Sequence, residues 1–154
     1  MSGKIYLIPN TLGGDEIKSI LPPANITLLN RITIYIVENT RNARRFLLKC
    51  GYDRGIDNSL FMELNKHTQP GEVEKMLDSC LEGSDIGLIS EAGLPGIADP
   101  GASVVSLAHQ KNIKVIPLTG PSSLFLSLAA SGLNGQEFRF HGYLPIHEKQ
   151  RIQK

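Results

Sequence analysis

Short apolar runs rich in β-branched residues alternate along the chain with stretches whose apolar side chains recur at helical spacing. The short runs predict strands at Lys4–Ile8, Ile32–Val37, Leu60–Leu64, Asp85–Ser90 and Lys114–Leu118, and a last short one at Phe138–Phe140. The helical spacing predicts helices at Pro22–Asn30, Thr40–Cys50, Pro70–Glu82, Gly101–Lys111 and Pro121–Ser131. Strands that alternate with helices need crossover connections, which predict a mostly parallel sheet of about five strands.

The predicted strands are apolar throughout instead of alternating with polar residues, as expected where both faces of a sheet are covered. The fold class is therefore α/β, with a three-layer α/β/α sandwich. In such folds ligands bind beyond the carboxyl ends of the strands. Three loops at these positions have unusual sequences, and they are Pro9–Gly14, Glu91–Gly101 and Thr119–Ser123.

The most distinctive loop reads SEAGLPGIADPG from Ser90 to Gly101 and carries three glycines and two prolines. Such a loop can bring backbone groups close to a ligand, although a tight strand-to-helix connection is the alternative interpretation. The loop is longer than the usual 2–6 residues, which favours a binding role. Thr119–Ser123 would offer free N–H groups at a helix start, or would simply cap that helix. Pro9–Gly14 is neither GxGxxG nor a Walker A sequence, which argues against dinucleotide or triphosphate binding.

Composition adds limits to this picture. The chain has 154 residues, 41% hydrophobic and 20% charged, which is typical of one soluble globular domain. The formal net charge of +1 means that any contact with RNA must be local. No signal peptide and no apolar run long enough to span a membrane is present, so we expect a cytoplasmic protein without a membrane partner. Cys50 and Cys80 are expected to be reduced, structural thiols.

Five segments together carry a family resemblance: Glu38–Arg41 (ENTR), SEAGLPGIADPG, TGPSS at 119–123, AASGL at 129–133 and FHGYLP at 140–145. In this order they resemble the tetrapyrrole methylase family, most closely the bacterial branch that methylates ribose 2′-O of ribosomal RNA. The resemblance implies that S-adenosylmethionine lies in a cleft between this N-terminal domain and a second domain, usually in a homodimer. The isolated domain is therefore expected to be inactive.

The same resemblance predicts a cofactor-binding domain over residues 1–145 and a linker over 146–154 toward a second domain. Phe138, Phe140, Tyr143 and Leu144 would then be covered by that second domain. By position, the cofactor would contact Pro9, Asn10, Thr11, Leu12, Gly13, Gly93, Leu94, Pro95, Gly96, Ile97, Pro121, Ser122 and Ser123.

The chain departs from the branch at Asn39, Glu91 and Leu94, where the branch usually has Asp, Asp and Thr. A non-catalytic S-adenosylmethionine-binding module and a tetrapyrrole methyltransferase therefore stay open as alternatives. The AGLPGIADPG and FHGYLP segments favour the RNA branch.

Methyl transfer needs in-line positioning and no metal, and a base helps to deprotonate a ribose hydroxyl. The candidates are Glu38, Glu91, Asp99 and His141. Asp99 suits a helix cap, with Pro100 in the first turn. Glu38 is either functional or paired with Arg41. We predict Glu38, Arg41 and Glu91 as the catalytic group.

One predicted helix carries four cations at i+3 and i+4 spacing, and they are Arg41, Arg44, Arg45 and Lys49. They form either a contact for RNA phosphates or a solvated basic face. Arg41 is the one favoured for a functional contact, because it belongs to the ENTR segment.

Overall fold

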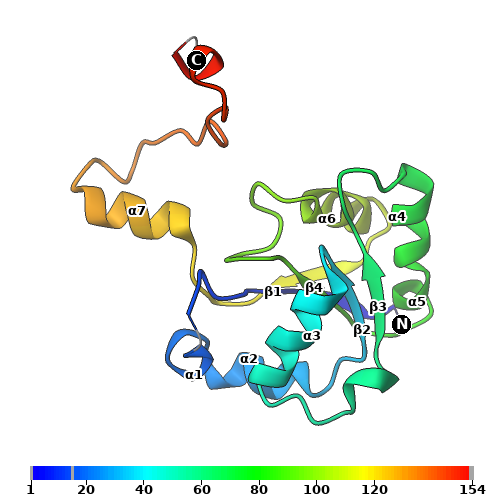
Figure 1. Ribbon diagram of the computed structural model, residues 1–154. Helices are drawn as coiled ribbons and strands as arrows, with labels where there is room; N and C mark the ends of the chain where they lie inside the picture. The colour runs from blue at the N-terminus through cyan, green and yellow to red at the C-terminus, as the bar shows by residue number, and fades with distance from the viewer. Residues whose placement is uncertain (1, 15, 153–154) are drawn as a thin grey trace. The chain divides into compact units, whose positions relative to one another are not determined.

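The computed structural model describes residues 2–14 and 16–152, without the side chain of Gln150. Within this part of the chain, five strands form one parallel sheet in the order β3-β2-β4-β1-β5 (Figure 1). The strands are β1 (Lys4–Ile8), β2 (Ile34–Val37), β3 (Leu60–Glu63), β4 (Ile86–Ile89) and β5 (Lys114–Pro117). Every ladder is parallel, with Ile86 of β4 opposite both Ile5 and Ile34. The predicted α/β fold with a five-stranded sheet is confirmed.

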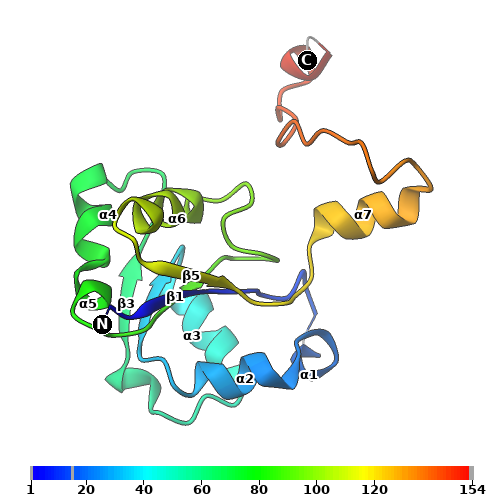
Figure 2. The same ribbon diagram turned by 180° about the vertical axis from the view of Figure 1, so that it is seen from behind.

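Helices cover both faces of the sheet (Figure 1). On one face lie α1 (Ile17–Ile20), α2 (Pro23–Leu29) and α3 (Thr40–Lys49). On the other lie α4 (Pro70–Met76), α5 (Asp78–Leu81) and α6 (Gly101–Gln110). A short 3-10 turn, Ile56–Asn58, precedes β3. Figure 2 shows from behind that β5 runs beside β1.

Two hydrophobic clusters hold the layers together, and each strand contributes to both because successive side chains point to opposite faces. Tyr6 and Ile8 belong to one cluster, and Ile5 belongs to the other. Cys50 and Cys80, one in each cluster, are buried and free. Burial raises the pKa of the Cys50 thiol to about 12 and that of Cys80 to about 11, so both stay protonated at neutral pH. This agrees with their predicted role as reduced, structural thiols.

Strand β2 begins at Ile34, two residues after the predicted Ile32, and Tyr35 in this strand reaches back to the preceding segment. Its buried hydroxyl donates to the carbonyls of Leu29 (3.0 Å) and Ile32 (2.9 Å), and Tyr52 also donates to the Ile32 carbonyl (2.9 Å). The carbonyl of Ile32 is thereby bound by side chains. Burial also raises the pKa of Tyr35 far above its ordinary value.

Three further differences from the prediction concern local structure. The helix predicted over Pro70–Glu82 is two helices, since the chain tightens at the buried Leu77, whose N–H donates to the Glu74 and Lys75 carbonyls. Helix α1 and the 3-10 turn were not predicted, because four-residue and three-residue segments carry little periodicity. The strand predicted at Phe138–Phe140 is wrong: this segment is irregular, and no described strand pairs with it.

The chain divides into two compact units, Met1–Ser123 and Leu124–Lys154. The second contains most of α7 (Ser123–Ser131) and α8 (Glu148–Ile152). Within it the rings of Phe125 and Phe138 meet edge to face, 5.9 Å apart. Most of its large apolar side chains are exposed, among them Tyr143 by 80% and Leu144 by 64%, while Leu124 and Leu128 are half-buried. Over the part of the chain that is described, none of the helices is long and apolar enough to cross a membrane.

Candidate cofactor site

The first two of the three unusual loops follow neighbouring strands, β1 and β4, and are joined directly to each other. Asn10 and Gly93 form an isolated antiparallel bridge, in which each N–H donates to the other's carbonyl (2.9 and 3.2 Å). From this point the chain leaves β1 toward α1 on one face and leaves β4 toward α6 on the opposite face (Figure 1). Divergence of this kind at the carboxyl edge of a parallel sheet opens the position where α/β proteins bind ligands.

The side chain of Asn10 strengthens this bridge. Its amide nitrogen donates to the carbonyls of Ser90 and Glu91, both at 3.1 Å, and its oxygen accepts from the Thr11 N–H at 2.8 Å. One side chain thus fixes the start of both loops. An amide suits this position because it carries donors and an acceptor together.

Replacing Asn10 by Ala should lower the free energy of unfolding by about 2 kcal/mol, because three backbone groups lose their partner and two of these hydrogen bonds are partly buried. Urea unfolding followed by circular dichroism would measure this. Asn58→Ala is a matched control, since it gives up only one long hydrogen bond to the Arg54 carbonyl (3.4 Å) and should change stability little. Equal stability of the two variants would show that Asn10 does not hold the loops.

The third loop meets the other two at Gly93. A Cβ added to Gly93 would lie 3.2 Å from Leu12 Cδ2 and 3.3 Å from the Pro121 carbonyl oxygen, so the three loops pack together there. Gly120 in turn packs against Pro9. Sequence reasoning therefore identified three loops that the fold brings to one place.

Asn25 is a positioning residue that sequence reasoning missed. It is buried on α2, and its amide nitrogen donates to the Thr119 carbonyl at 2.8 Å, which anchors the third loop to the helix. The available signal was a polar side chain on the buried face of an otherwise apolar helix, since buried amides are nearly always hydrogen-bonded.

Asp99 closes the second loop. Its carboxylate accepts from the Gly96 N–H (2.8 and 3.0 Å) and from the Gly101 N–H at 2.7 Å, in the first turn of α6. Asp99 was predicted to cap this helix with Pro100 in its first turn, but the N-cap position of α6 is Pro100, and Asp99 lies one residue before it, where it binds the N–H of the first helical residue, Gly101. Gly93, Gly96 and Ala98 have φ values of 67°, 85° and 60°. Glycine adopts such values freely, which suits Gly93 and Gly96, whereas Ala98 holds its φ of 60° against the ordinary preference of a residue with a Cβ.

The carboxylates predicted as catalytic lie next to this edge and are connected to each other. Glu38 follows β2, and its Oε1 accepts from the backbone N–H of Glu91 at 3.0 Å. Glu91 in turn accepts through Oε2 from the Asn42 amide at 2.5 Å. Glu38 is half-buried and Glu91 is exposed. The chain Glu38, Glu91, Asn42 links the end of β2, the second loop and the first turn of α3.

Arg41 is not paired with Glu38, contrary to that alternative. Its side chain is exposed and has no hydrogen bond or ion pair to any residue that the structure describes. Glu63 instead accepts from the Thr40 N–H at 2.9 Å, which keeps the pKa of Glu63 below its ordinary 4.5. Asn39, where an Asp was expected from the resemblance, caps α3 by accepting from the Asn42 N–H at 3.0 Å. Asn and Asp cap helices about equally well, so this departure leaves the helix start intact.

Arg44 and His141 were two further candidates from the sequence. Arg44 forms an ion pair with Asp57 and lies over the ring of Phe61, 5.8 Å from its centroid, so it is committed to packing. His141 belongs to the second compact unit. No group of three or more potential metal-ligating side chains is found among the described residues.

The predicted cofactor residues differ in exposure. Pro9, Gly93, Pro95 and Ser122 are buried and shape the edge. Leu12 and Ile97 are apolar yet 41% and 40% exposed, one on each of the first two loops. Apolar side chains exposed beside free backbone are suited to hold the flat base of a nucleoside.

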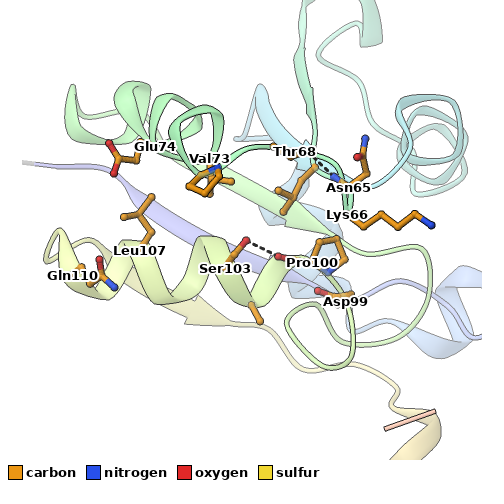
Figure 3. A pocket seen from close by; sticks show the side chains of 13 residues that line it. Asn65, Lys66, Thr68, Val73, Glu74, Asp99, Pro100, Ser103, Leu107 and Gln110 are labelled. Carbon is orange, nitrogen blue, oxygen red and sulfur yellow. Dashed lines mark hydrogen bonds between the residues drawn. The ribbon is translucent and has the colours of Figure 1, made fainter. Parts of the chain in front are cut away.

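A cavity that the sequence did not indicate lies between α4 and α6 (Figure 3). It has a volume of about 580 Å³ and is lined by Val73 and Glu74 of α4 and Leu107 of α6, with Lys66 and Asp99 at one end. Because Asp99 also binds the N–H of Gly96, this cavity adjoins the second loop.

The chain is similar to curated proteins named ribosomal RNA small subunit methyltransferase I. It is 33% identical over 152 residues to that of Vibrio cholerae, covering 97% of this chain and 49% of the relative. It is 32% identical over 151 residues to that of Xylella fastidiosa, covering 97% and 52%, and 32% identical over 151 residues to that of Halalkalibacterium halodurans, covering 98% and 50%.

The chain spans about half the length of the curated relatives it matches. No protein-family model matches it. The similarity to the relatives nevertheless extends over nearly every residue of this chain, including all three loops. The chain is therefore similar, over nearly its whole length, to about half of each of these small-subunit ribosomal RNA methyltransferases I, and its motifs resemble the tetrapyrrole methylases.

Proposed function

We propose that the chain forms the S-adenosylmethionine-binding domain of a methyltransferase that acts on ribose 2′-O of small-subunit ribosomal RNA. The observation that carries this proposal is the junction of three loops at Gly93, at the edge of the sheet where such folds bind ligands. The names of the relatives support the class of acceptor.

The proposed cofactor contacts are the thirteen residues predicted from the three loops. The loops suit an adenosine group because Leu12 and Ile97 present apolar surface. A Cβ added to Gly13 would meet nothing within 4 Å, so there is open space beside the first loop. Polar backbone at Gly93–Ile97 supplies hydrogen-bonding groups near that surface.

When bound, S-adenosylmethionine supplies a methyl group whose bond to sulfur breaks as the acceptor oxygen bonds to its carbon. We propose that Glu91 accepts the proton of the ribose hydroxyl, because its carboxylate is exposed at the edge of the site. Glu38 holds the Glu91 backbone, and Asn42 holds one carboxylate oxygen, so both act as positioning residues. Arg41 would contact the acceptor, since it has no partner within the described chain.

We further propose that the domain extends to residue 145 and that 146–154 leads toward a second domain. The relatives are about twice as long as this chain, and the second compact unit exposes many apolar side chains. A second domain, in a homodimer, would cover these apolar side chains and so account for their exposure. A cytoplasmic location is part of the same proposal, because ribosomal RNA is there.

The test is methyl transfer by the protein together with its proposed second domain, from radiolabelled S-adenosylmethionine to small ribosomal subunits and, in parallel, to a porphyrinoid precursor. We expect label in the ribosomal RNA, at a ribose 2′-O that resists alkaline hydrolysis. Label in the porphyrinoid alone would replace the RNA acceptor by the tetrapyrrole alternative. Cofactor binding in calorimetry without transfer to either acceptor would favour the non-catalytic module.

A further inference from the structure

We infer that Asp99 is a positioning residue for the cofactor, because its carboxylate holds Ala98 in a left-handed backbone conformation and thereby fixes the path of Gly93–Ile97. This inference rests on the proposed function, which assigns S-adenosylmethionine to that segment. It adds a residue that sets cofactor affinity without being one of the proposed cofactor contacts.

The carboxylate of Asp99 binds backbone groups on both sides of Ala98. It accepts from the Gly96 N–H through both oxygens, at 3.0 and 2.8 Å, and from the Gly101 N–H through Oδ1, at 2.7 Å. Hydrogen bonds to an ionised acceptor are roughly twice as strong as those between neutral groups. One half-buried side chain therefore closes the segment from Gly96 to Gly101 into a compact turn.

The position of this carboxylate depends on glycine at 101. A Cβ added to Gly101 would lie 2.8 Å from Asp99 Oδ1 and 3.4 Å from the Gly96 nitrogen. A side chain at this position would therefore push the carboxylate away from the two N–H groups. Asp99, Gly96 and Gly101 thus form one close-packed unit at the end of the second loop.

Ala98 is the residue whose conformation has to be held. Its φ of 60° is unfavourable for a residue with a Cβ, because the Cβ approaches the following carbonyl oxygen. Ala98 is exposed, so burial of its methyl group does not hold it there. Such conformations persist only when the surrounding structure imposes them. The hydrogen bonds from Asp99 to Gly96 and Gly101, on either side of Ala98, impose it here.

The start of the same loop is fixed without Asp99. The buried hydroxyl of Ser90 donates to the Gly93 carbonyl at 3.2 Å, and Asn10 forms its bridge to Gly93. Loss of Asp99 should therefore leave Gly93 in place and release the segment from Leu94 to Ile97. Because the cofactor would then have to order this segment on binding, its affinity should fall.

The experiment uses the protein together with its proposed second domain, and compares Asp99→Ala, Asp99→Asn and Asp99→Ala combined with Ala98→Gly. Asp85→Ala is a matched control, since Asp85 is also half-buried and accepts a backbone N–H, that of Lys4 at 2.9 Å, but directly before β4. Calorimetry gives the Kd for S-adenosylmethionine, and transfer to small ribosomal subunits gives kcat and KM. Amide hydrogen exchange followed by NMR reports on the Gly96 N–H, and circular dichroism checks folding.

We expect Asp99→Ala to raise the Kd and the KM for S-adenosylmethionine about tenfold, with kcat at saturating cofactor unchanged and faster exchange at Gly96. Asp99→Asn should stay within about threefold of the parent, because an amide oxygen in place of Oδ1 still reaches both N–H groups. Adding Ala98→Gly to Asp99→Ala should recover part of the lost affinity, since glycine adopts a φ of 60° freely. A merely structural loss would not be repaired in this way, and Asp85→Ala should bind as the parent does.

A parent-like Kd for Asp99→Ala, an equal loss in Asp85→Ala, or no recovery with Ala98→Gly would overturn the inference. If Asp99→Ala does not fold, Ala98→Val tests the same link with Asp99 in place, because β-branched residues are strongly disfavoured at this φ. A parent-like Kd for Ala98→Val would then count against the inference equally. Failure of the parent to bind S-adenosylmethionine would instead refute the proposed function, while exchange at Gly96 would still decide whether Asp99 holds the loop.

Discussion

Gly120→Ala should destabilise the protein by about 3 kcal/mol, the upper part of the range for overpacking. The added Cβ would lie 2.2 Å from Pro9 Cβ and 2.3 Å from Pro9 Cγ. Pro9 is almost fully buried and its ring cannot rotate away, so the first or third loop has to move. For a chain of this length, Tm should fall by roughly 6–12 °C.

A matched control is available in α4. A Cβ added to Gly71 would meet nothing within 4 Å, and the residue lies inside a helix. Gly71→Ala should therefore stabilise the protein by about 0.5–1 kcal/mol, since alanine loses less backbone entropy there. Thermal unfolding measures the expected fall in Tm for Gly120→Ala and the expected rise in Tm for Gly71→Ala. An unchanged Tm for Gly120→Ala would mean that the two loops are not packed as described.

Glu91→Gln should lower kcat about 100-fold or more, the usual contribution of a general base, while KM and the Kd for S-adenosylmethionine change little. Glutamine can still accept the hydrogen bond from Asn42 through its amide oxygen, so the loop should keep its position. What it loses is the ability to take the proton from the ribose hydroxyl. Transfer of radiolabel to small ribosomal subunits measures kcat.

Two variants separate this catalytic role from a structural one. Glu82→Gln changes an exposed glutamate at the end of α5, and should keep full activity. Glu91→Asp retains a carboxylate on a side chain shorter by one methylene and should recover part of the activity. If Glu91→Gln turns over at the parent rate, another group accepts the proton. If it instead weakens cofactor binding, Glu91 orders the loop and is not the base.

The sequence predicted the sheet well because the relevant signals are local. The strands from Lys4 to Pro117 are short apolar runs, and the turns between them are marked by glycine and proline. Strands that are buried on both faces are apolar throughout, without alternating polar residues. This pattern predicted a parallel sheet between two layers of helices. The strand predicted at Phe138–Phe140 is wrong because a β-ladder needs a partner strand, and the local sequence does not specify one.

The candidate site was predictable in its loops but not in its connections. The sequence by itself determined which segments could bring backbone to a ligand, because glycine and proline restrict or free the chain wherever they stand. Only the tertiary structure decided that Asn10 holds the second loop, that Asn25 holds the third, and that Glu38 binds the backbone of Glu91. These pairs lie 53 to 94 residues apart in the chain, and such contacts exist only after the strands have been ordered β3-β2-β4-β1-β5.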